Sequence, residues 1–400
     1  VAYAPADRYP TAADFKAALL DCRAPVAPPA SRKAPIPTRT LPGRAAVVLA
    51  AVPPVATGPR PGTEAAEQTM PLPVAERLLW VAATGDEVRG TGAVAEELLL
   101  IGSYDTNLHA LDLLSGAPLW RFGTGRGICS TPTVFKDLAI VGSEDGAVYG
   151  VALDGGRLKW RFRTNMPVRS SPRAAEHAVF IGSDDSCVYK LDAASGDLLW
   201  RYRTYGPVRS SPALAGDLAI IGSEDGFLYA LSQANGRQVW RFATAKPVYA
   251  TPVVAGDVVV CGSLDGSIYG LGLAQGEQRW RFETGGPVVA TAAVRDGRAY
   301  VGSTDGRFYA FDAKSGEKVW DVAHGGRITS SAAATPDRLY YGGLDGSIYC
   351  LERETGAISW THAIGKPVPA SPVLHGALLL IGGTDGKVYA LATGERGFEG

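Results

Sequence analysis

Residues 207–244 read PVRSSPALAGDLAIIGSEDGFLYALSQANGRQVWRFAT, and this stretch decides the fold. We expect four strands in it, at 207–214, 217–222, 227–231 and 239–244. Asp225-Gly226 and Asn235-Gly236 lie between these segments and are strong signals for tight hairpin turns. Because short strands follow one another through such turns, no room is left for a helix. The stretch therefore predicts a four-stranded antiparallel meander.

The same unit recurs every forty residues. All eight tryptophans keep this spacing: Trp80, Trp120, Trp160, Trp200, Trp240, Trp280, Trp320 and Trp360. A Gly-Ser/Gly-x-Asp tetrapeptide repeats in the same way from Gly102 to Gly382, and a tyrosine repeats from Tyr149 to Tyr389. A period of this length with four strands per unit predicts the blades of a β-propeller.

The ends of the repeat region set the number of blades. The last unit ends near Leu391, before a fourth strand of its own, whereas residues 78–83 form a fourth strand with no unit before it. These two parts complete one blade and remove the free sheet edge that an open ring would carry. The sequence thus predicts an all-β protein with one eight-bladed propeller at residues 75–400.

The blade motif resembles that of pyrroloquinoline-quinone (PQQ) type propellers, AxDxx(T/S)GxxxW. One full match consists of Ala110, Asp112, Ser115, Gly116 and Trp120, and a second of Ala310, Asp312, Ser315, Gly316 and Trp320. The resemblance implies that each tryptophan docks between neighbouring blades, so all eight tryptophans are expected to be structural.

Quinoprotein dehydrogenases share this fold. Those enzymes resemble one another in having a vicinal disulfide, a calcium site and a catalytic aspartate. None of the five cysteines here is adjacent to another, and the five histidines show no metal-ligand spacing. The aspartate of every Gly-x-Asp-Gly turn is expected to cap its own turn. We therefore expect no catalytic residue, no metal, and neither PQQ nor calcium as a cofactor.

Residues 1–22 differ from the repeats and predict a short helix. Pro5, Arg8 and Tyr9 precede it in a pattern that resembles the end of a bacterial eukaryotic-type Ser/Thr protein kinase domain. The glycine-rich, catalytic and DFG motifs of a kinase are missing from the chain, so it is not expected to transfer phosphate. Residues 23–74 hold twelve of the 27 prolines and predict a flexible linker.

The composition limits the partners. A net charge of −1 does not indicate a nucleic-acid partner. The longest apolar run outside the repeats, at 45–56, is too short to cross a bilayer and contains two prolines. With no secretory signal at its start, the sequence predicts a cytoplasmic, monomeric protein.

Functional residues are expected at the repeat positions that carry different residues in different blades. In a propeller, the loops before the first strand and the turns between the second and third strands share one face, around the channel mouth. Variable residues at these positions on neighbouring blades define the candidate ligand site: Arg126, Glu144, Met166, Arg169, Asp184, Tyr205, Arg209 and Glu224. This mixed cluster predicts a protein or small polar ligand, and the alternative is a set of solvated surface ion pairs.

The sequence favours a non-catalytic sensory or protein-interaction propeller of a bacterial Ser/Thr protein kinase, with a kinase domain as a partner in cis. A scaffold like the outer-membrane assembly lipoprotein is the first alternative. A PQQ-dependent dehydrogenase is the second.

Overall fold

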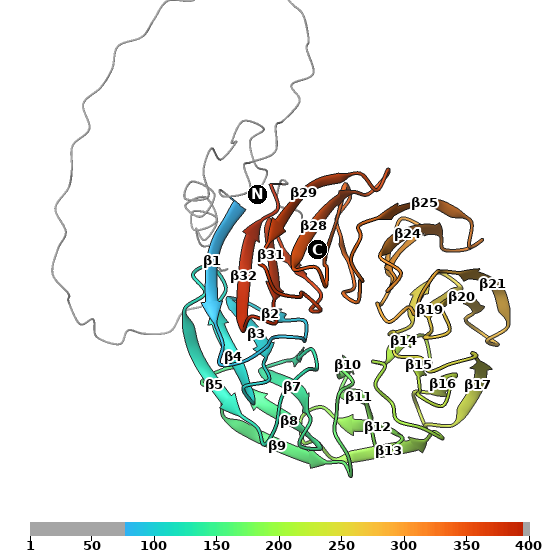
Figure 1. The fold of residues 1–400 in the computed structure, drawn as a ribbon. Coiled ribbons are helices and arrows are strands. Elements are labelled where there is room, and N and C mark those ends of the chain that lie inside the picture. The colour runs from blue at the N-terminus through green and yellow to red at the C-terminus, as the bar shows by residue number, and fades with distance from the viewer. Residues whose placement is uncertain (1–76, 395–400) are drawn as a thin grey trace, which may run out of the picture.

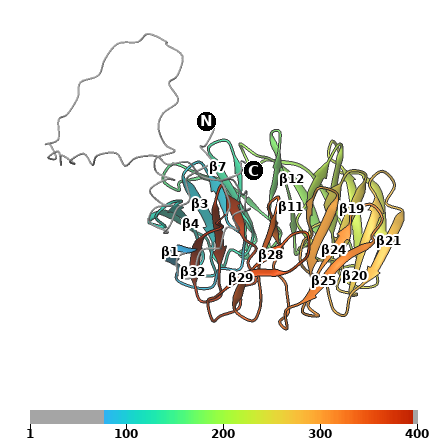
Figure 2. The same ribbon diagram turned by 90° about the horizontal axis from the view of Figure 1, so that it is seen from above.

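The computed structural model describes residues 77–394, and their strands form a ring of eight four-stranded antiparallel sheets (Figure 1). Each sheet is one blade. Figure 2 shows the ring close to edge-on, with the blades standing side by side. The predicted all-β, eight-bladed propeller is thereby confirmed. The predicted helix at 1–22 and linker at 23–74 lie outside the described residues.

The four strands of each blade lie side by side, in order from the centre of the ring to its rim. The innermost strands are β2 (Ala93–Ala95), β6 (Thr133–Phe135), β10 (Arg173–Ala175), β14 (Ala213–Ala215), β18 (Val253–Ala255), β22 (Ala293–Arg295), β26 (Ala333–Ala334) and β30 (Val373–His375). The second strands are β3 (Leu98–Gly102), β7 (Leu138–Ser143), β11 (Ala178–Ser183), β15 (Leu218–Gly222), β19 (Val258–Gly262), β23 (Arg298–Gly302), β27 (Arg338–Gly342) and β31 (Leu378–Gly382).

The third and outermost strands complete the blades. The third strands are β4 (Asn107–Asp112), β8 (Ala147–Ala152), β12 (Cys187–Asp192), β16 (Phe227–Ser232), β20 (Ser267–Gly272), β24 (Arg307–Asp312), β28 (Ser347–Glu352) and β32 (Lys387–Ala392). The outermost strands are β1 (Leu78–Ala83), β5 (Pro118–Gly123), β9 (Leu158–Arg163), β13 (Leu198–Arg203), β17 (Gln238–Ala243), β21 (Gln278–Glu283), β25 (Lys318–Ala323) and β29 (Ile358–Ala363).

The ring closes through β1. This strand pairs antiparallel with β32, with Val81 opposite Tyr389 and Ala83 opposite Lys387, and the sheet order is β1-β32-β31-β30. The last blade therefore takes its outer strand from the beginning of the repeat region, as the sequence predicts.

The innermost strands are shorter than expected. The strand predicted at 207–214 covers only Ala213–Ala215. Pro207 and Pro212 cannot donate to a sheet ladder, which limits this strand to its last residues. The preceding backbone instead bonds to neighbouring blades: Val208 N–H donates to the Ser183 carbonyl (3.0 Å), and the Ser211 hydroxyl accepts from Ser171 N–H (2.9 Å).

The tryptophans lie at the boundaries between blades. Trp200 in β13 donates its Nε1–H to the carbonyl of Gln233 in the next blade (3.0 Å). The same geometry recurs from Trp80 to Trp320 at the carbonyl thirty-three residues onward. At Trp360 the Arg77 guanidinium lies 4.8 Å from the ring centroid and donates to the Thr393 carbonyl. Each indole thus joins its blade to the following one.

The aspartates of the repeated turns accept hydrogen bonds from their own blade and from the loop that leads into it. Asp225 accepts from its own turn at Phe227 N–H (2.9 Å), from the Tyr229 hydroxyl (2.8 Å) and from Tyr205 N–H (2.9 Å). These contacts fasten the turn between β15 and β16 to the loop that leads into the blade. Both segments consequently lie on one face of the propeller, where the variable residues are displayed.

Candidate functional site

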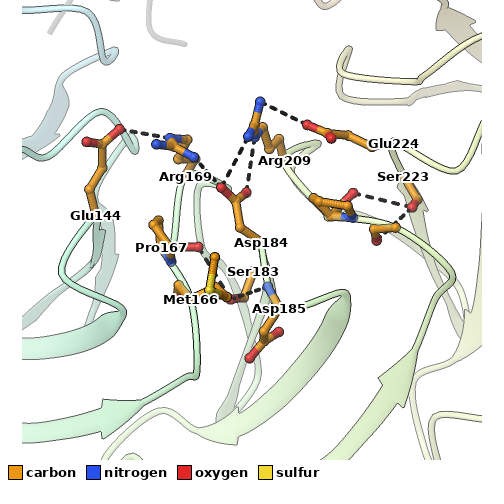
Figure 3. A network of polar contacts seen from close by, with 12 residues as sticks. Glu144, Met166, Pro167, Arg169, Ser183, Asp184, Asp185, Arg209, Ser223 and Glu224 are labelled. Carbon is orange, nitrogen blue, oxygen red and sulfur yellow. Dashed lines mark hydrogen bonds and ion pairs between the residues drawn. The ribbon is translucent and has the colours of Figure 1, made fainter.

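A row of alternating acidic and basic side chains crosses three neighbouring blades on this face (Figure 3). The acids come from the turns that follow β7, β11 and β15, and the arginines from the segments that precede β10 and β14. We call the row the ion-pair ladder: Glu144, Arg169, Asp184, Arg209 and Glu224. Five of the eight predicted site residues are therefore brought together.

Each arginine of the ladder bridges two blades. Arg169 Nε lies 2.8 Å from Glu144 Oε1 of the preceding blade, and its Nη1 contacts the Asp184 carboxylate of its own blade. Arg209 repeats this pattern, with Nε 3.1 Å from Asp184 Oδ1 and Nη1 2.8 Å from Glu224 Oε1. Asp184 is therefore the central member, since it accepts from both guanidinium groups.

Burial differs along the ladder. The Asp184 side chain is only 5% exposed, whereas the Arg169 and Arg209 side chains are each about one-third exposed. Partial burial lowers the pKa of both guanidinium groups, but their hydrogen bonds and the adjacent carboxylates outweigh it and raise the pKa overall. Three carboxylates face two arginines, so the ladder carries an excess negative charge.

A tyrosine stands at each end of the ladder, and neither was among the predicted site residues. Tyr104 lies with its hydroxyl 3.4 Å from Glu144 Oε1, and burial, with Cys129 and Glu144 nearby, raises its pKa to about 12. At the other end, burial and a hydrogen bond to Glu224 raise the pKa of Tyr249. Both occupy the same repeat positions as ladder residues, which is the signal that could have identified them.

The other three predicted residues lie apart from the ladder. Tyr205 is 81% exposed, Met166 is half exposed, and Arg126 is exposed. Their backbone groups hold the loops before β6, β10 and β14; the Arg126 carbonyl, for example, accepts from the Thr124 hydroxyl (2.6 Å). They add exposed apolar and cationic side chains beside the ladder on the same face.

The chemistry open to the ladder is the exchange of ion pairs and hydrogen bonds with a charged or polar partner. Each of its carboxylates is held by an arginine. Among residues 77–394, no three His, Cys, Asp or Glu side chains gather closely enough to hold a metal ion. The four cysteines in that part of the chain, Cys129, Cys187, Cys261 and Cys350, are free thiols.

The ring, its docked tryptophans and its forty-residue lattice define a β-propeller of the PQQ repeat type. A family model described as outer membrane protein assembly factor BamB matches residues 73–178, 148–250, 224–336 and 309–397. These matches cover more than half of the chain, which therefore belongs to this family of PQQ-repeat propellers.

Solved structures share the fold at low sequence identity. The crystal structure of BamB from Moraxella catarrhalis is 18% identical with a TM-score of 0.68, covering 79% of this chain and 99% of its own. The computationally designed Ika8 protein is 17% identical with a TM-score of 0.72, with the same coverage of both chains. A search of curated proteins gives no sequence match. No helix in the described part of the chain is long and apolar enough to span a bilayer.

Proposed function

We propose that this propeller is a non-catalytic protein-binding module whose partner contacts the face that carries the ion-pair ladder. The proposal rests on a difference between the repeated and the variable residues of the blades. Residues common to the blades, such as Trp200 and Asp225, are engaged in contacts between and within blades. The mixed-charge ladder, with exposed Met166 and Tyr205 beside it, is confined to three blades.

A protein partner suits this face better than a small ligand. The charges of the ladder are already paired with one another, so the ladder offers a set of exchangeable polar contacts. Half-exposed Met166 and the exposed ring of Tyr205 add the kind of apolar and aromatic anchors that interfaces use.

Photo-crosslinking tests which face is used. A crosslinking amino acid is placed at Tyr205 or Met166 in the full chain, and matched controls place it at Asp154 or Ser195 in turns of the opposite face. We expect one discrete protein adduct from the Tyr205 and Met166 positions, reproduced with the purified partner. Equal adducts from both faces, or adducts from the control positions alone, contradict the proposal.

We further propose that the module serves a bacterial Ser/Thr protein kinase in the cytoplasm. This proposal rests on the kinase-like pattern of residues 1–22. The alternative is an exported scaffold for outer-membrane protein assembly, which the family description favours. The reading frame upstream of Val1 distinguishes them: a kinase core supports the first proposal, and a lipoprotein signal supports the second.

We also propose that the module works without PQQ or calcium. Its sequence has no adjacent cysteines from which the vicinal disulfide of quinoprotein dehydrogenases could form. Titration of the full chain with PQQ and calcium, followed by absorbance, is expected to show no saturable change. A saturable spectrum with dye-linked alcohol oxidation overturns this proposal.

A further inference from the structure

A second charged surface lies on the rim of the ring, away from the ladder. In four successive outermost strands, β5, β9, β13 and β17, one repeat position is always arginine, and β9 and β13 carry another two residues later. We call this surface the arginine rim: Arg121, Arg161, Arg163, Arg201, Arg203 and Arg241. All six side chains are exposed, and none makes an ion pair within residues 77–394; Arg241 lies 4.8 Å from the centroid of the Phe227 ring. Figure 1 shows these four strands following one another along the outside of the ring.

The charge is restricted to one side of the ring. The same repeat position is occupied by Asp321, Thr361 and Val81 in β25, β29 and β1. Arg281 in β21 is paired with Glu283 at 2.9 Å. Since the other blades close their sheets with a different residue or with an ion-paired arginine here, the fold itself does not require the arginine rim.

Aliphatic side chains stand beside these arginines. Leu119, Leu199 and Val239 each lie two residues before a rim arginine, and Val239 is 52% exposed. Protection of a sheet edge from aggregation calls for charge alone. Exposed leucine and valine also occur at this position outside the rim, as at Val319. Beside the rim arginines they add apolar area that a partner can bury together with the charge.

The rim is hollowed between neighbouring outer strands. A hollow of about 430 Å³ is lined by Asn165, Met166, Asp185, Cys187, Arg201 and Arg203. A second, of about 350 Å³, lies at the equivalent repeat position two blades earlier and includes Leu119 and Arg121. Arginine therefore lines both of these hollows in the described part of the ring.

Among the described residues, the carboxylate in the larger hollow forms no ion pair with Arg201 or Arg203. Asp185 accepts from Asn165 N–H (3.0 Å), Cys187 N–H (3.1 Å) and the Tyr189 hydroxyl (2.7 Å). These bonds fasten its own turn, as in the other blades. Arg201 and Arg203 thus remain available to an anionic group from outside.

Shape and chemistry select the class of partner. The arginine rim follows four of eight blades and so curves around half of the ring, which a flat membrane cannot contact throughout. Single-stranded nucleic acids bind through stacking on exposed aromatic rings as well as charge. In these strands the aromatic rings are at most partly exposed, and the exposed apolar side chains are aliphatic. An extended polypeptide can follow the curve and supply both carboxylates and aliphatic side chains.

We propose that the arginine rim binds an extended acidic segment of a partner protein, with aliphatic residues interspersed among its carboxylates. The carboxylates pair with the arginines of successive blades, and the aliphatic residues cover Leu119, Leu199 and Val239. Met166 lines the larger hollow and also lies beside the ion-pair ladder, so a crosslink from Met166 does not distinguish the two surfaces. The other residues named for the arginine rim and for the ladder differ, so variants at those residues let the two proposals fail independently.

A labelled synthetic peptide that repeats Glu-Glu-Leu tests the proposal on the full chain by fluorescence anisotropy. The variant R163A/R203A removes two positive charges from the rim. Its control, A323E/A363E, changes the net charge by the same amount at the equivalent, exposed positions of β25 and β29 on the far side of the ring. We expect the first variant to bind the peptide about tenfold more weakly and the control to bind like the parent. Equal binding by both variants overturns the proposal.

Two further probes separate charge from apolar contact. The variant L119S/L199S is expected to weaken binding of the Glu-Glu-Leu peptide but not of an oligoglutamate of equal charge. Tighter binding of phosphatidylglycerol vesicles or oligodeoxythymidylate through the same arginines overturns the choice of a polypeptide. Self-association of R163A/R203A on gel filtration, with peptide binding unchanged, assigns the arginines to edge protection and also overturns the proposal.

Discussion

Trp200 packs against Gly236 of the next blade so closely that a Cβ on the glycine would lie 2.7 Å from the indole ring. Gly236 also has a φ of 70°, in the left-handed region that favours glycine. The same contact joins Trp80 to Gly116 and continues blade by blade to Trp320 and Gly356. One position of the repeat therefore meets two demands, a tight turn and a close approach between blades.

Substitution Gly236→Ala is expected to destabilise the propeller by about 3 kcal/mol, because overpacking against Trp200 adds to the cost of the left-handed backbone. Gly216 supplies the control. Its φ is 52°, but nothing lies within 4 Å of its absent Cβ. Gly216→Ala is therefore expected to cost only about 1 kcal/mol. Urea unfolding followed by tryptophan fluorescence measures both, and equal losses would show that the contact with Trp200 is unimportant.

Much of this ring could be predicted from the sequence because each repeated residue has one local task. The spacing of Trp200 and Gly236 fixes the blade, and the strand at 78–83 fixes the closure. The innermost strand was overestimated because Val208 and Ser211 bond to neighbouring blades, which a single repeat does not reveal.

The candidate site was only partly predictable. Repeat position showed that Glu144, Asp184 and Arg209 share a face, but which side chains pair depends on how blades are set against each other. The arginine rim does not stand out in the sequence, because the arginine that follows the lattice tryptophan is unpaired at Arg121 but paired at Arg281. Whether such an arginine is paired with an acid depends on contacts beyond its own strand.

Removal of both ladder arginines is expected to destabilise the fold, because the Asp184 carboxylate is buried and accepts from both. We expect R169A/R209A to lose about 2 kcal/mol, a value kept low because the arginines are partly exposed. Adding Asp184→Asn should recover most of the loss. Chemical unfolding of the three proteins checks this, with R157A as a control at an exposed pair with Asp154. No recovery in the triple variant would contradict the role of Asp184.

Because R169A/R209A is expected to lose stability, a loss of partner binding in that variant could reflect unfolding. A milder variant is therefore needed to test binding. The conservative variant R169K/R209K keeps both charges but not the geometry of the guanidinium groups. We expect it to fold like the parent and to reduce crosslinking from the Tyr205 position severalfold. Unchanged crosslinking would place the contact elsewhere on the face.

The propeller is expected to lose stability in mild acid through His324. Six blades carry a threonine and a serine at the corresponding corner, such as Thr124 and Ser143, whose hydroxyls lie 3.2 Å apart. His324 and Gly343 replace this pair, and neither buried ring nitrogen has a hydrogen-bond partner among residues 77–394. Burial lowers the pKa of His324, although the Asp345 carboxylate acts in the opposite direction.

The lowered pKa of His324 determines how stability changes with pH. The unfolded chain binds the proton more readily than the folded chain, so stability is full above the ordinary histidine pKa of about 6.5 and falls as pH drops below it. The loss levels off below the folded pKa. His362, whose pKa is also lowered by burial, contributes in the same direction.

Thermal unfolding between neutral and mildly acidic pH tests this account. The double variant H324T/G343S restores the threonine–serine pair of the other blades and should reduce the pH dependence. The matched control, I364T/G383S, makes the same repair in the next blade without removing a titrating group, so its pH dependence should equal that of the parent. A parallel change in both variants would assign the effect to the restored hydroxyls instead of to His324.

The closing strand β1 is expected to hold the ring together, because it supplies the outer strand of the last blade through its pairing with β32. Deletion of residues 1–84 removes that pairing and the contact of Trp80 with Gly116. We expect the truncated chain to unfold at lower urea concentration and to self-associate through the exposed edge of β32. A synthetic peptide of residues 77–84 added in trans should partly reverse both effects, whereas a peptide of the same composition in scrambled order should not. Since sheet pairing depends on register, equal rescue by both peptides would mean that closure does not require the pairing of Val81 with Tyr389.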